Sequence, residues 1–395
     1  MNASGRYPML WRADVLPATV TPAQRCTRGT LRSIAMQGLV KGALVLFALA
    51  LLAGCDASPP PASSSYAGLG QDAADFAQVE RGRPLRFPDD FGAHHGYRIE
   101  WWYVTANLKD DQGRDWGVQW TLFRSAQRPG PEEAGWNSPN VWMGHAGLNG
   151  PTGHRAAETL ARGGIGQAGV NALPFRAWID DWRLESRDGV NMDRLLMQAG
   201  GHDFTYRLHL DSEGPLVAHG DRGYSEKSGQ GQASYYFSQP FYRVDGEIEH
   251  AGERVHVTGS AWLDREWSSQ PLSAEQKGWD WFSLHLGNGA KLMLFQVRQT
   301  SGTPYRAGTW IAADGTATAL RSDQILLTAL TWTRQDNGKR VPTQWRVQVP
   351  DHAVDVTADA IQPQSWMGTS FPYWEGPVRL SGAPGGRGYL EMTGY

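Results

Sequence analysis

Short segments in which apolar and polar residues alternate, separated by turn sequences, constrain this fold more than any other feature. Residues 98–108 and 115–124 alternate in this way, are rich in Trp, Tyr, Val and Thr, and flank the turn sequence Asp110-Asp111-Gln112-Gly113. Successive side chains of a strand point to opposite faces, so this pattern predicts a β-hairpin. The other predicted strands are residues 204–210, 247–263, 281–286, 291–298 and 343–349, and the Asn-Gly at 288–289 predicts a second hairpin turn.

Helical signals are weak. No long amphipathic helix is predicted, and residues 273–277 form a helical turn at most. The chain also contains 18 Trp and 47 Gly residues. Short strands rich in aromatic residues and glycine are typical of β-barrels and β-sandwiches, so we predict an all-β fold.

The segment from Met36 to Cys55 has the layout of a bacterial lipoprotein signal. Lys41 precedes an unbroken apolar run at residues 43–53, which is long enough for a signal-peptide core and too short to span a bilayer. The run ends in Leu52-Ala53-Gly54-Cys55, which resembles a lipobox, and the Cys55 thiol would receive the lipid. Residues 1–54 are therefore predicted to be a removable signal segment. An ordinary signal peptide, or a membrane anchor with a chance cysteine, is the alternative.

The flanks of this segment refine the prediction. Residues 1–34 carry five Arg residues and one acid, so we place the true start at Met36, with a long basic leader as the alternative. Residues 55–80 are predicted to be the lipidated Cys and a tether, because residues 58–67 are rich in Pro, Ser and Ala. We expect a lipid-anchored protein of the cell envelope that faces the periplasm. Asp56 favours the inner membrane, by the sorting rule of enteric bacteria.

Charge and cysteine content exclude several classes of function. Removing residues 1–54 takes six basic and one acidic residue from totals of 37 and 40, which leaves a net charge of −8. Binding to phosphate backbones needs clustered positive charge, so nucleic acid is not expected as a partner. Cys26 lies in the signal segment, and Cys55 is then the only mature cysteine, so no intrachain disulfide is expected.

Two parts of the chain echo one another. Glu100-Trp101-Trp102-Tyr103 opens a predicted hairpin that ends at Arg124, and Asp280-Trp281-Phe282-Ser283 opens one that ends at Arg298. Each unit has an acid, a Trp, a further aromatic residue, a hairpin and a closing Arg. We interpret them as two copies of one β-domain, residues 81–259 and 260–395. Convergence of two unrelated hairpins is the alternative.

The segment 261–267 is the strongest candidate for chemistry. On a strand, Trp262, Asp264 and Glu266 would share one face, and Leu263, Arg265 and Trp267 the other. A carboxyl group enclosed by aromatic side chains has a raised pKa and can donate a proton near neutral pH. The alternative is a salt bridge at the domain junction, for example to Arg124 or Arg298. Glu100 has the same ambiguity, since it could act as an acid or pair with a buried Arg.

Other catalytic and cofactor motifs are missing from the sequence. The histidines lack ligand-like spacing, so neither a metal nor another cofactor is predicted. There is no Gly-x-Ser-x-Gly elbow, dinucleotide fingerprint or P-loop. His145 could face a cavity, and a structural histidine is the alternative reading.

Several long motifs, in order, resemble the AttH-like family, which is related to the carotenoid 1,2-hydratases (CrtC). The resemblance spans about residues 80–395 and implies two packed lipocalin-like β-domains. The motifs that carry it are Ile99-Glu100-Trp101-Trp102-Tyr103-Val104-Thr105-Ala106-Asn107-Leu108, Trp262-Leu263-Asp264-Arg265-Glu266-Trp267, Gly278-Trp279-Asp280-Trp281-Phe282, Tyr373-Trp374-Glu375-Gly376-Pro377-Val378 and Gly388-Tyr389-Leu390-Glu391-Met392-Thr393-Gly394-Tyr395.

The resemblance also implies site residues. In the carotenoid hydratases water adds across a terminal double bond, and a Tyr-x-Asp pair and a His-x-Trp pair are implicated. The first pair matches Trp262-x-Asp264 and the second Tyr235-x-Phe237, so the Asp is kept while the Tyr and His are replaced. Aromatic faces would stabilise the carbocation formed when Asp264 protonates an alkene. The residues expected to contact a ligand are Trp262, Tyr235, Phe237, Trp101, Trp102, His145 and Trp281.

Three functions remain open at this point. The first is an envelope lipoprotein that binds a lipid, isoprenoid or polyene, with an ABC transporter permease as a partner, because AttH-like members often accompany permease genes. The second is a hydro-lyase or isomerase that uses Asp264 as general acid, with Glu266 and Glu100 as further candidates. The third is a non-catalytic envelope scaffold, which would have no cavity of ligand size.

Overall fold

The computed structural model describes residue 73, residues 75–270, residue 273 and residues 275–395, all within one compact unit, Ser64–Tyr395. Of these residues, 60% lie in strands and 4% in helices, so the predicted all-β fold is confirmed. No helix of the described part is long and apolar enough to cross a membrane. The predicted signal segment, Cys55 and most of the predicted tether lie outside the described residues.

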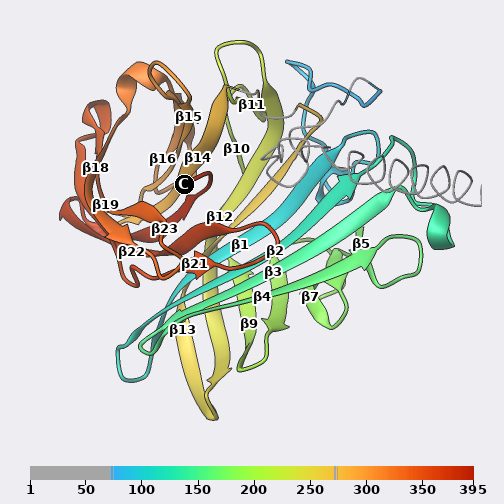
Figure 1. Cartoon of the computed structure of the whole chain (residues 1–395), viewed down its shortest axis with the longest axis horizontal. Coiled ribbons are helices and arrows are strands. Elements are labelled where there is room, and N and C mark those ends of the chain that lie inside the picture. The colour runs from blue at the N-terminus through green and yellow to red at the C-terminus, as the bar shows by residue number, and fades with distance from the viewer. Residues whose placement is uncertain (1–72, 74, 271–272, 274) are drawn as a thin grey trace, which may run out of the picture. The chain divides into compact units, whose positions relative to one another are not determined.

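The first sheet has 13 strands, and of the two sheets one curls into a nearly closed barrel and the other forms a half-barrel (Figure 1). Its order is β4-β3-β2-β1-β13-β12-β9-β8-β7-β6-β5, and β10 and β11 pair with β12. Its strands are β1 (Ile99–Asp110), β2 (Asp115–Ala126), β3 (Asn140–Gly150), β4 (Gly153–Arg162), β5 (Ala168–Asn171), β6 (Arg176–Ile179), β7 (Trp182–Ser186), β8 (Arg194–Gly200), β9 (Phe204–Ser212), β10 (Val217–Ala218), β11 (Tyr224–Glu226), β12 (Ala233–His250) and β13 (Glu253–Ser268).

The second sheet has ten strands. Its order is β17-β16-β15-β14-β23-β22-β20-β19-β18, and β21 pairs with β22. Its strands are β14 (Gln276–Leu286), β15 (Lys291–Gln299), β16 (Tyr305–Ile311), β17 (Ala317–Leu320), β18 (Leu326–Arg334), β19 (Arg340–Val349), β20 (Val354–Ala360), β21 (Trp366–Met367), β22 (Tyr373–Ala383) and β23 (Gly386–Met392). The described helices are short 3₁₀ turns, η2 (Asp89–Phe91), η3 (Gly135–Asn137), η4 (Ser322–Gln324) and η5 (Pro350–His352).

Both predicted hairpins are present, as β1–β2 and β14–β15. One local prediction is wrong. Residues 247–263 are not one strand, because Ala251 and Gly252 have φ angles of 53° and 80° and make the turn between β12 and β13. At residues 273–277, where a helical turn at most was predicted, the Gln276 amide donates to the Ser273 carbonyl at 3.0 Å, and β14 begins at Gln276.

The two echoing hairpins share an ion pair between the opening acid and the closing Arg. Arg124 pairs with Glu100, which lies directly opposite it in the β1–β2 register, and Arg298 Nε lies 3.3 Å from Asp280 Oδ2. The sheets change between Ser268 and Gln276, since β13 belongs wholly to the first sheet. The division into domains at 259/260 stays a prediction.

The side chains of each sheet divide between an interior core and a layer between the sheets. Alternate residues of β1 illustrate this, because Trp102 and Val104 belong to the core of the first sheet while Tyr103 belongs to a cluster that includes Trp281 and Phe295 of the second sheet. The second sheet has its own core, which includes Phe282. The third cluster packs the outer face of one sheet against the other and leaves room there for a cavity.

Candidate functional site

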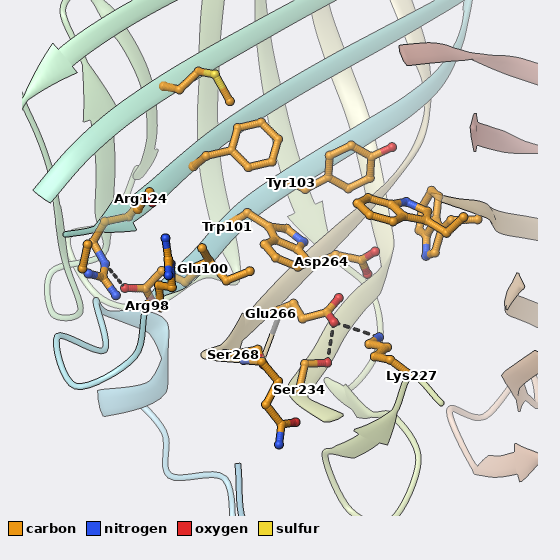
Figure 2. Close-up of a pocket in the computed structure, with 18 of the residues that line it drawn as sticks. Arg98, Glu100, Trp101, Tyr103, Arg124, Lys227, Ser234, Asp264, Glu266 and Ser268 are labelled. Atoms are coloured by element: carbon orange, nitrogen blue, oxygen red, sulfur yellow. Dashed lines mark hydrogen bonds and ion pairs between the residues drawn. The ribbon is translucent and has the colours of Figure 1, made fainter. Parts of the chain in front are cut away.

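A cavity of about 520 Å³ lies between the two sheets. β1, β2, β3, β12 and β13 form one wall, and β14, β15 and β23 form the other. The aromatic residues that line it are Trp101, Tyr103, Phe123, Trp279, Trp281 and Phe295. Figure 2 shows Trp101, Tyr103, Asp264 and Glu266 on the first-sheet side, with Lys227 reaching toward Glu266.

Asp264 is the most unusual group in the cavity wall. Its side chain is 3% exposed and has no ion-pair partner among the described residues. Oδ1 accepts hydrogen bonds from Trp262 Nε1 at 2.6 Å and from the Ser238 hydroxyl, and Oδ2 accepts one from the Tyr236 hydroxyl at 2.7 Å. Burial raises the pKa of Asp264 to about 7, because loss of water outweighs these three donors. The group can therefore hold or release a proton near neutral pH.

Glu266 lies two residues further along the same face but is differently compensated. Its Oε1 is 2.8 Å from Lys227 Nζ and accepts a hydrogen bond from the Ser234 hydroxyl (Figure 2). The Lys227 ammonium also lies over the rings of Tyr236 and Phe295, 4.8 and 4.5 Å from their centroids. Glu266 is thus held in a salt bridge at the cavity wall, whereas Asp264 has no such partner among the described residues and is the group suited to proton transfer.

The opposite wall carries a second carboxyl group, Glu391 of β23. Trp279 Nε1 donates to Glu391 Oε1 at 2.6 Å. Burial raises the pKa of Glu391 to about 7, and the negative charge of Asp264 adds to the rise. The cavity therefore lies between two carboxyl groups, one from each sheet, that titrate in the same pH range.

A buried chain of hydrogen bonds runs from Asp264 away from the cavity. Ser238 Oγ lies 2.6 Å from His219 Nε2, and His219 Nδ1 lies 2.8 Å from Thr309 Oγ1 on β16 of the second sheet. Burial lowers the pKa of His219 to about 3, so the imidazole is neutral. The chain links the carboxyl group of one sheet to a hydroxyl group of the other through a histidine that can exist as either tautomer.

This chain can run in two directions. With Asp264 ionised, Ser238 donates to the carboxylate, His219 Nε2 donates to Ser238, and Thr309 donates to His219 Nδ1. With the proton on Asp264 Oδ1, each of these bonds reverses and the imidazole changes tautomer. Hydroxyl groups and a neutral imidazole can each donate or accept, so both protonation states leave the chain satisfied.

The structure brings some of the predicted site residues together. Trp262, Asp264 and Glu266 share one face of β13, and Leu263 and Trp267 lie in the core on the other, as predicted. Trp101 and Trp281 line the cavity, whereas Trp262 holds the Asp264 carboxylate. The alternative of a salt bridge applies to Glu266, whose partner is Lys227, whereas the two partners suggested as examples, Arg124 and Arg298, pair with Glu100 and Asp280.

Three residues predicted to contact a ligand lie on the wrong face. Tyr235 and Phe237 of β12 and Trp102 of β1 belong to the core inside the first sheet. Their neighbours Tyr236 and Ser238 face Asp264 instead. A shift of one residue along a strand moves every side chain to the opposite face. This explains why Tyr235 and Phe237, which were matched to the His-x-Trp pair, do not lie in the site.

Glu100 is structural, which corrects its assignment as a candidate acid. Its carboxylate pairs with both Arg124 and Arg265 and accepts a hydrogen bond from the His94 backbone at 2.9 Å. The two guanidinium groups outweigh burial and hold the pKa of Glu100 well below its usual range. A carboxylate held this way cannot serve as a proton donor near neutral pH.

His145 is also away from the cavity lining. Its ring nitrogens lie 3.0 Å from the Tyr373 hydroxyl and 3.1 Å from Glu158 Oε1, and burial lowers its pKa. The structural reading of His145 therefore fits its surroundings better than ligand contact does. Within the described ranges, no three His, Cys, Asp or Glu side chains are grouped so as to hold a metal ion.

The site also contains residues that were not among the predicted ones, including Lys227, Tyr236, Ser238, His219 and Glu391. Glu391 lies in the closing motif noted above, but nothing in the sequence shows that β23 pairs with β14 and faces β13 across a cavity. His219 stands alone in a loop region, so no spacing signal marks it. Both positions depend on contacts between segments far apart in the chain.

Comparison with known proteins places the chain in a family. The model of the AttH-like family matches residues 78–395. A crystal structure of a protein from Nitrosomonas europaea described as an AttH is 34% identical, has a TM-score of 0.72, and covers 81% of this chain and 100% of its own. No curated protein matches this chain.

More distant similarity extends to two solved structures. Kievitone hydratase from Nectria haematococca has a TM-score of 0.60 at 15% identity, with 81% of this chain and 96% of the other covered. CghA with Sch210972 has a TM-score of 0.50 at 11% identity, with 82% and 97% covered. At these identities the likeness shows a shared fold. The family match over most of the length, together with the 34% identical structure, shows that this chain belongs to the AttH-like family.

Proposed function

We propose that this protein is a lipid-anchored envelope protein that binds a hydrophobic small molecule, such as a lipid, isoprenoid or polyene, in the cavity between its two sheets. The observation that carries the proposal is the cavity itself, which has a volume of about 520 Å³ and a mostly apolar lining that includes six aromatic side chains. Ligand sites typically enclose roughly 300–1,000 Å³ and are mostly apolar with a few placed polar groups. A scaffold would have no use for such a space.

The setting of this function comes from the sequence. The lipobox-like segment ending at Cys55 supports a lipid anchor facing the periplasm, and Asp56 favours the inner membrane. The family resemblance supports an ABC transporter permease as the partner that receives or supplies the ligand. The net negative charge predicted for the mature chain supports a ligand other than nucleic acid.

The test is recovery of the bound molecule. We would purify the full-length protein from membranes of its native host, denature it, and identify what it releases by mass spectrometry. We expect a defined hydrophobic compound near one per protein in the wild type, and much less in Trp281→Ala, which removes an indole from the cavity wall. Trp332→Ala is the matched control, since Trp332 is exposed on β18 of the second sheet and does not line the cavity. Equal recovery from both variants would refute binding in this cavity.

A second candidate is acid catalysis on an alkene, and Asp264 is the observation that favours it. An Asp264 carboxyl that holds its proton near pH 7 could transfer it to one alkene carbon. The other carbon would become cationic beside the aromatic wall, and a water oxygen would bond to it while the Glu391 carboxylate takes the water proton. The net reaction is the addition of one water molecule to the alkene. The proton taken up by Glu391 then returns to Asp264. The distant kievitone hydratase shares the fold but not enough sequence to carry its activity over.

Asp264→Asn separates the two candidates. If the protein is only a carrier, the variant binds ligand as the wild type does. If it is an enzyme, the variant binds ligand but no longer converts it, and converted product accumulates only with the wild type. A variant that unfolds would show that Asp264 is structural and would remove the catalytic candidate.

A further inference from the structure

Four large apolar side chains are exposed together at one end of the first sheet. Trp136 of η3 is 81% exposed, Val141 of β3 36%, Leu160 of β4 55% and Ile165, just after β4, 57%. We call these four residues the rim patch. Contacts hold them side by side, because Val141 pairs with Arg162 across β3–β4, and Arg162 donates to the Trp136 carbonyl at 2.8 Å. The Gly135 amide donates to the Gly164 carbonyl at 2.7 Å, which ties the loop carrying Ile165 to η3.

The rim patch is continuous with the cavity. Val141 and Leu160 belong both to the patch and to the cavity lining, where they adjoin Met143 and Phe123. Because these two side chains are also exposed, the cavity opens to the surface beside Trp136. A hydrophobic molecule that enters or leaves at this opening would pass directly over apolar side chains.

The described chain begins at the same end of the sheet. Ala73 packs against Phe76 and Ala126, and Ala126, the last residue of β2, lines the cavity. The predicted lipid-bearing Cys55 precedes Ala73 by 18 residues. Such a segment spans at most roughly 60 Å when fully extended. The described chain thus starts beside the cavity opening, which is the point from which the segment leading to the predicted anchor departs.

We propose that the rim patch rests on the bilayer that holds the lipid anchor, so that the cavity opens onto the membrane surface. This rests on the function proposed above and names the partner surface of that site. The Trp136 ring carries the Arg162 guanidinium 5.8 Å from its centroid, and Trp and Arg together suit the boundary between head groups and acyl chains. Arg128 is paired with Glu133 at 2.6 Å, which offsets its charge, so the docking rests mainly on the apolar side chains of the rim patch and is not expected to require anionic lipid.

The experiment uses full-length lipidated protein reconstituted in phosphatidylcholine vesicles with brominated acyl chains, which quench tryptophan only at short range. Trp136 and Trp332 are the exposed tryptophans of the described chain. We expect quenching of the wild type, its loss in Trp136→Phe, and no change in Trp332→Phe. Quenching in Trp136→Phe equal to that of the wild type would overturn the proposal.

A second measurement keeps this inference separate from the cavity's function. The probe is parinaric acid, a fluorescent polyene fatty acid, moving between vesicles and protein. In Trp136→Asp/Ile165→Asp, which alters residues outside the cavity lining, we expect transfer to slow about tenfold with unchanged occupancy at equilibrium. Unchanged transfer would refute docking through this patch. A wild type that never takes up the probe would count against the proposed cavity function, while the bromolipid result would still decide the docking.

Discussion

Replacing Asp264 by Asn should change how stability depends on pH, and the size of the change follows from the site. The pKa of Asp264 is about 7 in the folded protein against an ordinary value of 3.8, because burial disfavours the charged form. Between these two values the unfolded chain releases its proton while the folded protein keeps it. Raising the pH through this window therefore favours unfolding. The full effect is about 4 kcal/mol, of which about 3 kcal/mol falls between pH 5 and pH 8.

The sign is the reverse of that for a salt-bridged carboxylate. Stability associated with neutral Asp264 is complete below pH 3.8 and is lost as the pH rises to about 7. Asn cannot ionise, so Asp264→Asn escapes this loss. An amide facing the Tyr236 hydroxyl does not titrate, and the lower pKa that the variant gives Glu391 shifts the difference in the same direction, because Glu391 then also disfavours the folded state less as the pH rises. The free energy of unfolding of the variant relative to wild type should therefore rise by about 3 kcal/mol from pH 5 to pH 8.

Urea unfolding at the two pH values, followed by tryptophan fluorescence, measures this difference. Thr105→Val is the control, because it alters a buried polar side chain of β1 without removing a titrating group, and its relative stability should not change with pH. If the difference between Asp264→Asn and wild type is the same at pH 5 and pH 8, Asp264 does not gain or lose a proton in that range. The acid proposed for catalysis would then have no basis.

Three further predictions use the same network and its surroundings. Ser238→Ala should raise the pKa of Asp264 further, since it removes a donor to the carboxylate; infrared titration of the carboxyl band would show it, and a fall would contradict the hydrogen-bond chain. Asp264→Asn should lower the pKa of Glu391, because a nearby negative charge is lost; the same titration would detect no shift if the two groups were independent. Glu100→Gln should destabilise the fold by roughly 3–5 kcal/mol, because two buried guanidinium groups lose their counter-charge, and chemical unfolding would measure it. The amount of ligand recovered per folded Glu100→Gln protein should match that of the wild type. A lower recovery would indicate that Glu100 takes part in binding.

The sequence is sufficient for the parts of this fold that are set locally. Alternation along residues 98–108 and 115–124 predicts both the β1–β2 hairpin and the division of its side chains between two faces. The same rule places Asp264 and Glu266 together. It fails where the turn lacks its usual residues, as at Ala251-Gly252, where a predicted single strand is two strands of a hairpin.

The site itself depends on pairing that periodicity does not encode. Residues paired between β1 and β13 are 147 to 169 positions apart in the chain, and those paired between β14 and β23 are 100 to 112 apart, so a local pattern does not show how the cavity walls are assembled. For this reason Lys227, His219 and Glu391 could not be assigned to Asp264 in advance. Tyr235 and Phe237 illustrate the opposite error, because they were assigned to the site by resemblance but lie in the core of the first sheet. An alignment shifted by one residue places a strand's side chains on the opposite face.

The energetics of Asp264 bear on the choice between a carrier and an enzyme. A cavity that only holds an apolar molecule gains nothing from a buried carboxyl group whose ionisation costs about 4 kcal/mol of stability at pH 8. Trp262, Tyr236 and Ser238 nevertheless place three donors on that carboxylate, which keeps the ionised form accessible. A group balanced between two protonation states, with a reversible hydrogen-bond chain behind it, is suited to giving up a proton and taking it back. If Asp264→Asn is more stable at pH 8 and binds the ligand as well as wild type does, carriage alone cannot account for the acid, and proton transfer to the ligand becomes the explanation to test.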